Sequence, residues 1–258
     1  MNWIMNNINF YDLGEDEYAK GNYKTALSYF EKLQPQTSDG LNYIGCCHLF
    51  LGNFDIAISN FRNLIAAKPD WERPVFNLGR VYLKIGEKEE AFKCFTKALE
   101  INNQNEDALF YMGLYYFEDE EYDIAKTYFM QSLMIDNNQS ETHLNLGICY
   151  WSLSDYNSAL LHFDKAYLLD RNNFDALSNK GRTLILLKDF KAALEAFKLA
   201  YDIKSDEIEL LTDIVYCNLK LKSYDNAYEW TKKAMDLDPD NERVKKFKVK
   251  IEKIFGQM

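Results

Sequence analysis

Apolar residues recur along the chain at intervals of three and four positions, in paired segments of about 14 residues each. Such spacing places the apolar side chains on one face of an α-helix. In residues 72–105, one stripe consists of Val75, Leu78, Gly79 and Tyr82, and the next of Ala91, Phe95 and Ala98. The pattern therefore predicts an all-α chain of helix pairs, in which a helix A is followed by a helix B.

A period of 34 residues connects these pairs. Helix A carries a glycine near its middle, at Gly45, Gly79, Gly113, Gly147 and Gly181. An alanine follows twelve residues later, at Ala57, Ala91, Ala125, Ala159 and Ala193, and a phenylalanine four residues after that, at Phe61, Phe95, Phe129, Phe163 and Phe197. The series extends back to Gly14, Ala26 and Phe30 after one interval of 31, and forward to Val215, Ala227 and Thr231. The chain is therefore a tandem array of one unit.

Small residues at two fixed positions of the unit have a packing reason. Glycine inside a helix costs roughly 1 kcal/mol relative to alanine, so its recurrence indicates a point where helices A and B cross closely. We expect the phenylalanine to fill the space beside that crossing. A further glycine seven residues after the first, at Gly21, Gly52 and Gly86, is expected in the turn between the helices, because glycine readily ends a helix.

This unit resembles the tetratricopeptide repeat, a helix–turn–helix motif of 34 residues. The resemblance implies an α-solenoid, a right-handed superhelix whose A helices line a concave side. Residues 1–241 are predicted to hold seven repeats, at about 7–38, 38–71, 72–105, 106–139, 140–173, 174–207 and 208–241. The first repeat departs most from the pattern, because Gln34, Pro35 and Gln36 are expected to break its second helix early.

A different segment follows at residues 242–258. Val244, Phe247, Ile251 and Ile254 form one apolar stripe, and Asp240 or Asn241 can cap a helix that begins there. Residues 241–258 carry six basic and two acidic residues, mostly off the stripe. The segment is therefore predicted to be a C-terminal capping helix, which covers the apolar face that a last repeat would otherwise expose.

The composition excludes several classes of protein. Hydrophobic residues make up 47% of the chain, which is enough for a buried core and argues against intrinsic disorder. The formal net charge of −10 disfavours a primary nucleic-acid binder, which needs a basic surface. The sequence contains no run of 18 apolar residues, so membrane insertion is not expected. The five cysteines have an odd count and no compact spacing, and the first residues lack a basic start, so a cytoplasmic chain without disulfides is expected.

No constellation of residues indicates catalysis. The three histidines have no metal-ligand spacing with a cysteine or carboxylate. Cys47, Cys149 and Cys217 share the tenth position of helix A, where a small residue packs in the hairpin core, so buried and unreactive thiols are expected. The sequence thus predicts a protein that is not an enzyme and that holds no cofactor or metal.

Side chains of the A helices are the candidate binding residues. The resemblance implies that positions 2, 5, 9, 12 and 13 of each repeat face the groove, and positions 5, 9 and 12 also form an i, i+4, i+7 stripe. In repeats four and five this stripe is apolar: Phe110, Leu114, Phe117, Leu144, Ile148 and Trp151. We predict a central apolar patch for a partner's amphipathic helix or extended segment. The alternative is that these side chains pack against neighbouring A helices.

The flanks of this patch are more polar. Position 9 is Arg80 in repeat three, where Phe76 holds position 5, and Arg182 in repeat six. Position 6 carries Asn77, Asn145 and Asn179, and in some members of the resembled family an asparagine ladder here binds the backbone of an extended peptide. Position 2 is acidic in five repeats, which either favours basic residues in the ligand or only stabilises the helix starts.

Two functions follow from these residues. The first is a scaffold or adaptor that binds a peptide or helix of a partner protein through apolar anchors. No repeat pairs Lys with Asn at positions 5 and 9, so the clamp with which chaperone-binding family members hold a terminal carboxylate is not expected. The alternative is a structural protein that oligomerises head to tail through the basic C-terminal helix and the acidic first repeat, with Asp12, Glu15, Asp16 and Glu17.

Overall fold

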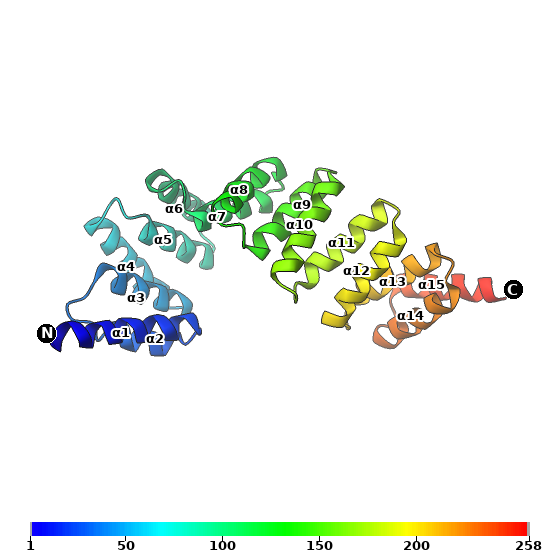
Figure 1. Cartoon of the computed structure of the whole chain (residues 1–258), viewed down its shortest axis with the longest axis horizontal. Helices are drawn as coiled ribbons and strands as arrows, with labels where there is room; N and C mark the ends of the chain where they lie inside the picture. Colours follow the sequence, from blue (N-terminus) through cyan, green and yellow to red (C-terminus); the bar gives the residue numbers. More distant parts are fainter. Residues whose placement is uncertain (1, 257–258) are drawn as a thin grey trace. The chain divides into compact units, whose positions relative to one another are not determined.

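The computed structural model describes residues 2–256, and only the backbone of residues 2–9. All regular secondary structure in this part of the chain is helical, and most neighbouring helices along the chain pack against one another as antiparallel hairpins (Figure 1). The helices are α1 (Asn2–Ala19), α2 (Tyr23–Phe30), α3 (Ser38–Phe50), α4 (Phe54–Ala67), α5 (Glu72–Lys84), α6 (Lys88–Ile101), α7 (Glu106–Glu118), α8 (Tyr122–Ile135), α9 (Ser140–Ser152), α10 (Tyr156–Leu169), α11 (Phe174–Leu186), α12 (Phe190–Ile203), α13 (Ile208–Lys220), α14 (Tyr224–Leu237) and α15 (Glu242–Phe255). The predicted all-α class and the predicted order of helix pairs are confirmed.

The chain forms two compact units, Met1–Tyr115 and Tyr116–Met258. The first contains α1–α6 and most of α7, and the second contains the end of α7 and α8–α15. Within each unit, every hairpin lies beside the next one along the chain (Figure 1). The A helices are the odd-numbered ones, and they carry all the candidate binding residues.

The predicted contact between glycine and phenylalanine closes five of the described hairpins, those of Gly14, Gly45, Gly79, Gly147 and Gly181. A Cβ atom placed on Gly45 would lie 2.6 Å from Cε1 of Phe61, and one placed on Gly79 would lie 2.7 Å from Cε1 of Phe95. Phe61 and Phe95 are fully buried, as are Ala57 and Ala91 at the other small position. Glycine is therefore needed because the phenylalanine ring of helix B occupies the place of its side chain.

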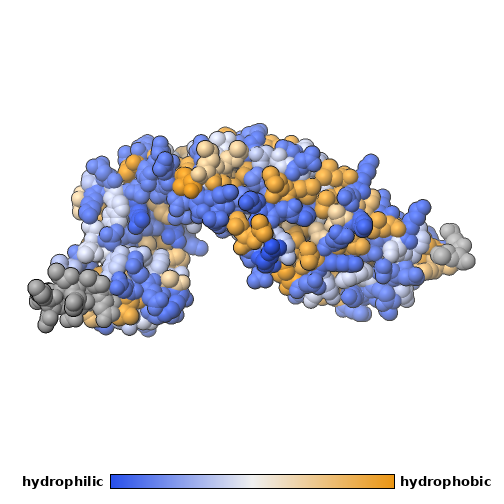
Figure 2. Space-filling model, viewed as in Figure 1, coloured by the Kyte–Doolittle hydropathy of each residue, from blue (hydrophilic) through white to orange (hydrophobic). Residues whose placement is uncertain are grey.

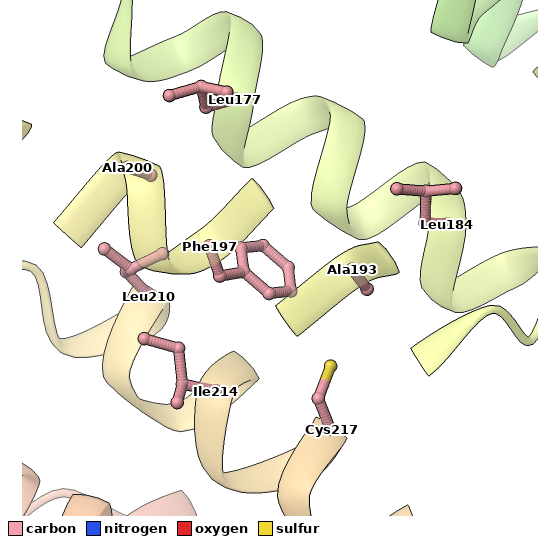
Figure 3. Packing of buried hydrophobic residues seen from close by; sticks show 8 residues of the cluster. All are labelled: Leu177, Leu184, Ala193, Phe197, Ala200, Leu210, Ile214 and Cys217. Carbon is pink, nitrogen blue, oxygen red and sulfur yellow. The ribbon is translucent and has the colours of Figure 1, made fainter. Parts of the chain in front are cut away.

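Each core cluster joins a hairpin to the first helix of the next repeat. In repeat six, Leu177 and Leu184 of α11 lie on one side of Phe197, and Leu210 and Ile214 of α13 lie on the other (Figure 3). The remaining members of this cluster are Ala193, Ala200 and Cys217. The hydrophobic core is therefore a series of local clusters, and the A helices are held in place from both sides.

Left-handed residues form the turns between helices A and B. Gly21, Gly52 and Gly86 have φ angles of 78°, 78° and 85°, as their predicted turn positions require. The Gly86 N–H donates to the Leu83 carbonyl at 3.1 Å, and the Glu87 N–H donates to the Tyr82 carbonyl at 2.9 Å, which is the Schellman motif. Four later turns use the same conformation without glycine: Glu120, Ser154, Lys188 and Lys222 have φ angles of 60°, 64°, 64° and 59°.

The two ends of the repeat array have separate features. α2 is only eight residues long and ends at Phe30, where the Gln36 side-chain amide donates to the Phe30 carbonyl at 3.1 Å. At the other end, the Asn241 side chain accepts from the Val244 N–H at 3.2 Å and caps α15. Val244 and Ile251 of α15 are buried against α13 and α14, so a capping helix forms after the last repeat, over residues 242–255.

Candidate binding face of the A helices

The candidate binding residues lie on four A helices. Phe76, Asn77 and Arg80 are on α5, and Phe110 and Leu114 are on α7 in the first unit. Phe117 at the end of α7, Leu144, Asn145, Ile148 and Trp151 on α9, and Asn179 and Arg182 on α11 belong to the second unit.

On α5, the candidate residues are largely used within the protein. Phe76 and Asn77 are each only 6% exposed. The Phe76 ring packs against Phe95 and Tyr111, and the Asn77 amide donates to Asn42 Oδ1 at 3.1 Å. The Arg80 guanidinium donates to Asn77 Oδ1 at 3.2 Å and lies over the Phe76 ring. This group therefore offers little free surface to a ligand.

The apolar stripe of α7 is half-buried. The Phe110 ring packs edge-on against Tyr111, with centroids 5.7 Å apart. Phe117 packs against Tyr122 at 5.6 Å and against Phe129 at 6.3 Å. Leu114 is also half-buried. These contacts shield part of the apolar surface of α7 from solvent.

On α9 the stripe is more open. Leu144, Ile148 and Trp151 lie on the same face of α9, each about one helical turn from the next. Leu144 and Ile148 are half-buried, and Trp151 is 41% exposed. Apolar residues stand among hydrophilic ones on the surface of the second unit (Figure 2). Trp151 is the most accessible of the twelve candidate residues, and its indole combines a large apolar area with one hydrogen-bond donor.

Arg182 on α11 belongs to an ionic network that the sequence did not reveal. Its Nη2 donates to Glu209 at 2.8 Å, and its Nε donates to Asp213 at 3.2 Å. Asp213 also accepts from Arg243 of α15 at 2.7 Å, and the Asp213 side chain is only 9% exposed. A nearly buried carboxylate between two guanidinium groups has its charge matched, so Arg182 and Arg243 fix the position of α13 against its neighbours.

A cavity of about 390 Å³, which we call the repeat-six cavity, adjoins this network. Its lining residues are Phe174, Asp175, Ser178, Asn179, Arg182, Lys204, Glu207, Glu209 and Leu210. Ser178 is 5% exposed, and its hydroxyl makes no hydrogen bond in the structure. Sequence reasoning had singled out Asn179 and Arg182 here and had missed Ser178, which holds the same fifth position as Phe76, Phe110 and Leu144.

The three cysteines at the tenth position of helix A are buried and have raised pKa values. Cys47, Cys149 and Cys217 are fully buried, and burial raises the pKa of each of these thiols to about 12. The thiolate is the reactive form of cysteine, so these thiols remain protonated at neutral pH. The expectation of buried, unreactive cysteines at the tenth position is confirmed.

Two histidines form a pair that sequence reasoning missed. His143 Nε2 lies 3.0 Å from Asn137 Oδ1, which can only accept, so Nε2 carries the proton of the neutral ring. His143 Nδ1 therefore accepts from His162 Nδ1–H at 2.9 Å. Burial lowers the pKa of both rings, that of His162 to about 4 with a further contribution from His143. The signal was a polar residue at the fourth position, which is apolar in the other repeats from the second onward.

Two further features bear on function. Among the residues that the structure describes, no group of three or more His, Cys, Asp or Glu side chains is arranged to hold a metal ion. In the same part of the chain, every helix is too short or too polar to cross a bilayer.

Comparison of the sequence with protein families gives one family description. Tetratricopeptide repeat models match residues 76–105, residues 144–208, and residues 107–139 together with 208–241. These ranges cover more than half of the 258 residues. No curated protein matches the sequence.

Solved structures with similar folds agree with this family. PilF from Pseudomonas aeruginosa has a TM-score of 0.69 at 19% identity, over 83% of this chain and 97% of its own. The C-terminal part of a TPR repeat-containing protein from Cytophaga hutchinsonii has a TM-score of 0.68 at 18% identity, over 92% and 98%. YrrB, described as a TPR protein with an unusual peptide-binding site, has a TM-score of 0.67 at 22% identity, over 73% and 97%. At these identities the likeness establishes the fold.

Proposed function

Because the chain belongs to the tetratricopeptide repeat family, whose members are scaffolds for protein interactions, we propose that it is a non-catalytic adaptor. The ligand is a peptide or helix of a partner protein, and the binding surface is the A-helix face of the second unit. We define this face by Leu144, Asn145, Ile148 and Trp151 of α9 together with the repeat-six cavity.

The observation that carries the proposal is the open stripe on α9. A tryptophan that is 41% exposed, one turn beyond two apolar side chains, is the kind of anchor that dominates protein interfaces. An i, i+4, i+7 row of this kind suits an apolar face of a helix or alternate side chains of an extended segment.

Polar groups beside the stripe support a peptide ligand. The side-chain amides of Asn145 and Asn179 make no hydrogen bond within the described residues, whereas the equivalent Asn77 is bonded to Asn42. An amide side chain offers one acceptor and two donors, which match the carbonyl and N–H of a peptide backbone. YrrB, a structural relative, is itself described as a peptide-binding protein, which is consistent with this assignment.

The first unit contributes less to binding in this proposal. Phe76 and Asn77 are buried, and Arg80 is held by Asn77 and by aromatic rings. In repeat three these positions therefore serve packing, whereas in repeat five Leu144, Ile148 and Asn145 remain partly accessible.

Capture of partner proteins tests the proposal. The intact chain, a Phe117→Ala/Trp151→Ala double variant and a Trp151→Ala single variant are immobilised in parallel. Phe117 packs on Phe129, so the single variant separates loss of binding from loosening of the hairpin. Leu161→Ala is the matched control, because Leu161 is an exposed apolar residue on α10 of the same repeat. Proteins retained by the intact chain and by Leu161→Ala, and lost from both Trp151 variants, support the proposal. Equal retention by all four contradicts it.

A further inference from the structure

The repeat-six cavity has an unusual balance of paired and unpaired groups. Arg182 is paired with Glu209, and Lys204 is paired with Glu207. Three carboxylates and two cationic groups line the cavity, so its formal charge is −1. Asp175 is the carboxylate that makes no hydrogen bond or ion pair within the described residues. Glu207 and, more weakly, Asp175 raise the pKa of Lys204, so a ligand meets the net charge of −1 that the cavity carries as a whole.

Two neutral acceptors accompany that carboxylate. Asp175, Ser178 and Asn179 stand at i, i+3 and i+4 on α11, so their side chains share one face of the helix. The Ser178 hydroxyl is buried and has no partner, which is a cost that native structures rarely leave unrelieved. The Asn179 amide oxygen is also without a partner among the described residues.

We propose that the repeat-six cavity is a subsite for a basic side chain of the bound segment, with Asp175, Ser178 and Asn179 as its acceptors. This inference rests on the proposed function and names the chemistry of the ligand at one point. A lysine ammonium has three donors and no acceptor. The Asp175 carboxylate and the Asn179 amide oxygen accept at the surface of the cavity, and the Ser178 hydroxyl, which lies just beneath it, accepts after a rotation of its side chain. The cavity of about 390 Å³ has room for the side chain and for part of the adjoining backbone.

An anionic ligand fits less well. Both cationic groups of the cavity already bind carboxylates, and Asp213 holds Arg182 from the far side. A phosphate or a terminal carboxylate would have to displace Glu207 or Glu209 and would enter a cavity whose net charge is already −1. Electrostatic complementarity therefore selects a cation.

The first unit provides a matched control. A cavity of about 550 Å³ there is lined by Asp39 and Lys68, which hold the repeat positions of Asp175 and Lys204. At the fifth position that repeat has Asn42, whose side chain accepts from Asn77. An unsatisfied hydroxyl therefore lines the repeat-six cavity and not the cavity of the first unit, and we expect Asp39→Asn to leave binding unchanged.

The test uses a random dodecapeptide phage library as the probe, selected on the full chain. We expect the retained peptides to share a lysine or arginine at a fixed spacing from their apolar residues. The strongest peptide is then synthesised with that residue intact and with norleucine in its place, and both are titrated against wild type, Asp175→Asn and Asp39→Asn. On wild type and Asp39→Asn, norleucine is expected to weaken binding about tenfold, and on Asp175→Asn less than twofold.

Ser178→Ala adds an independent readout. Removing an unsatisfied buried hydroxyl is expected to raise the thermal midpoint, while the same change weakens binding of the lysine peptide more than that of the norleucine peptide. A structural role for Ser178 would instead lower the midpoint and leave the ratio of the two affinities unchanged.

The outcomes separate this inference from the proposed function. Peptides that bind through Trp151 but carry no shared basic residue overturn the cationic subsite and leave the adaptor intact. An equal effect of norleucine on wild type and Asp175→Asn also overturns it. A library that yields no peptide, or peptides indifferent to Trp151→Ala, contradicts the adaptor and the subsite together.

Discussion

At the scale of single residues, fixed pairs of side chains decide how closely the helices approach. A glycine of helix A faces a buried phenylalanine ring of helix B in repeat after repeat, with no room for a Cβ atom between them. Interiors packed at this density respond to a change of one methyl group. His143 and His162 form a different pair at the corresponding interface of repeat five.

Gly79→Ala tests the contact with Phe95. The added methyl group must displace a ring that is 1% exposed, so overpacking outweighs the gain in helix propensity, and we expect a loss of about 1–2 kcal/mol. Urea denaturation followed by circular dichroism measures it. In a Phe95→Leu background the same substitution should cost clearly less, because the ring that it meets has gone. Equal costs in the two backgrounds would show that another neighbour, such as Cβ of Cys94 at 3.0 Å, opposes the added methyl group.

The histidine pair predicts acid sensitivity. Burial holds the folded pKa of His162 at about 4, below the ordinary value of 6.5, and that of His143 is also lowered. The unfolded chain therefore binds more protons than the folded chain between about pH 6.5 and pH 4, and stability falls as the pH falls through this window. The loss is expected to reach about 1–3 kcal/mol.

Repeat six shows which residues can replace the two histidines in a variant that tests this pH dependence. It carries Leu177 and Ala196, both buried, at the positions of His143 and His162. The double variant His143→Leu/His162→Ala should lose much of the decline in thermal midpoint between pH 6.5 and pH 4. A decline as steep in the variant as in the wild type would assign it to other groups.

At the scale of elements, helix A, turn and helix B are specified by different signals. The helices follow from apolar spacing, and three turns follow from glycine, so these parts could be predicted from the sequence. The turns at Glu120, Ser154, Lys188 and Lys222 adopt the same left-handed conformation without glycine, because the packed helices on either side impose it. Such residues carry strain of about 1 kcal/mol or more.

Lys188→Gly relieves that strain. Its φ of 64° is freely available to glycine, so we expect the free energy of unfolding to rise by about 1 kcal/mol. The matched control is Lys198→Gly, which makes the same exchange at an exposed position inside α12 and should lower stability by about 1 kcal/mol. Both are measured by urea denaturation. Destabilisation by Lys188→Gly would mean that the lysine side chain has a stabilising contact.

The binding face was predicted less completely than the helices. The register placed Leu144, Ile148 and Trp151 on one side of α9, because that depends only on spacing within a helix. It could not show that Asp213 would bind both Arg182 and Arg243, because these partners lie 31 and 30 residues away along the chain. Nor could it show that Ser178 would be buried without a partner. Contacts between repeats depend on packing that no local pattern encodes.

At the scale of the whole molecule, the alternative of head-to-tail assembly concerns opposite charges at the two ends of the chain. Much of the acidic charge in the first repeat is used locally: Asp16 and Glu17 pair with Lys20, and Glu15 accepts from the Tyr43 hydroxyl. α15 exposes several lysines, of which Lys245 pairs with Asp240. Local pairing thus lowers the acidic charge that the first repeat offers to a second chain, although most lysines of α15 form no ion pair within the described residues.

Light scattering across a salt series measures that attraction. At about 10 mM ionic strength the Debye length is roughly 30 Å, so electrostatic association would be strongest there. We expect the mass of a single chain at low and high salt alike. Scattering that grows with protein concentration at low salt and disappears on adding salt would instead support self-assembly through the charged ends.

The central claim is that the α9 stripe binds the partner, and the affinity of one captured segment tests it most directly. Isothermal titration calorimetry with wild type, Trp151→Ala and Leu161→Ala compares two exposed apolar residues of the same repeat. We predict a loss of about 2 kcal/mol, or roughly thirtyfold, for Trp151→Ala and less than twofold for Leu161→Ala. An unchanged affinity for Trp151→Ala would contradict the account.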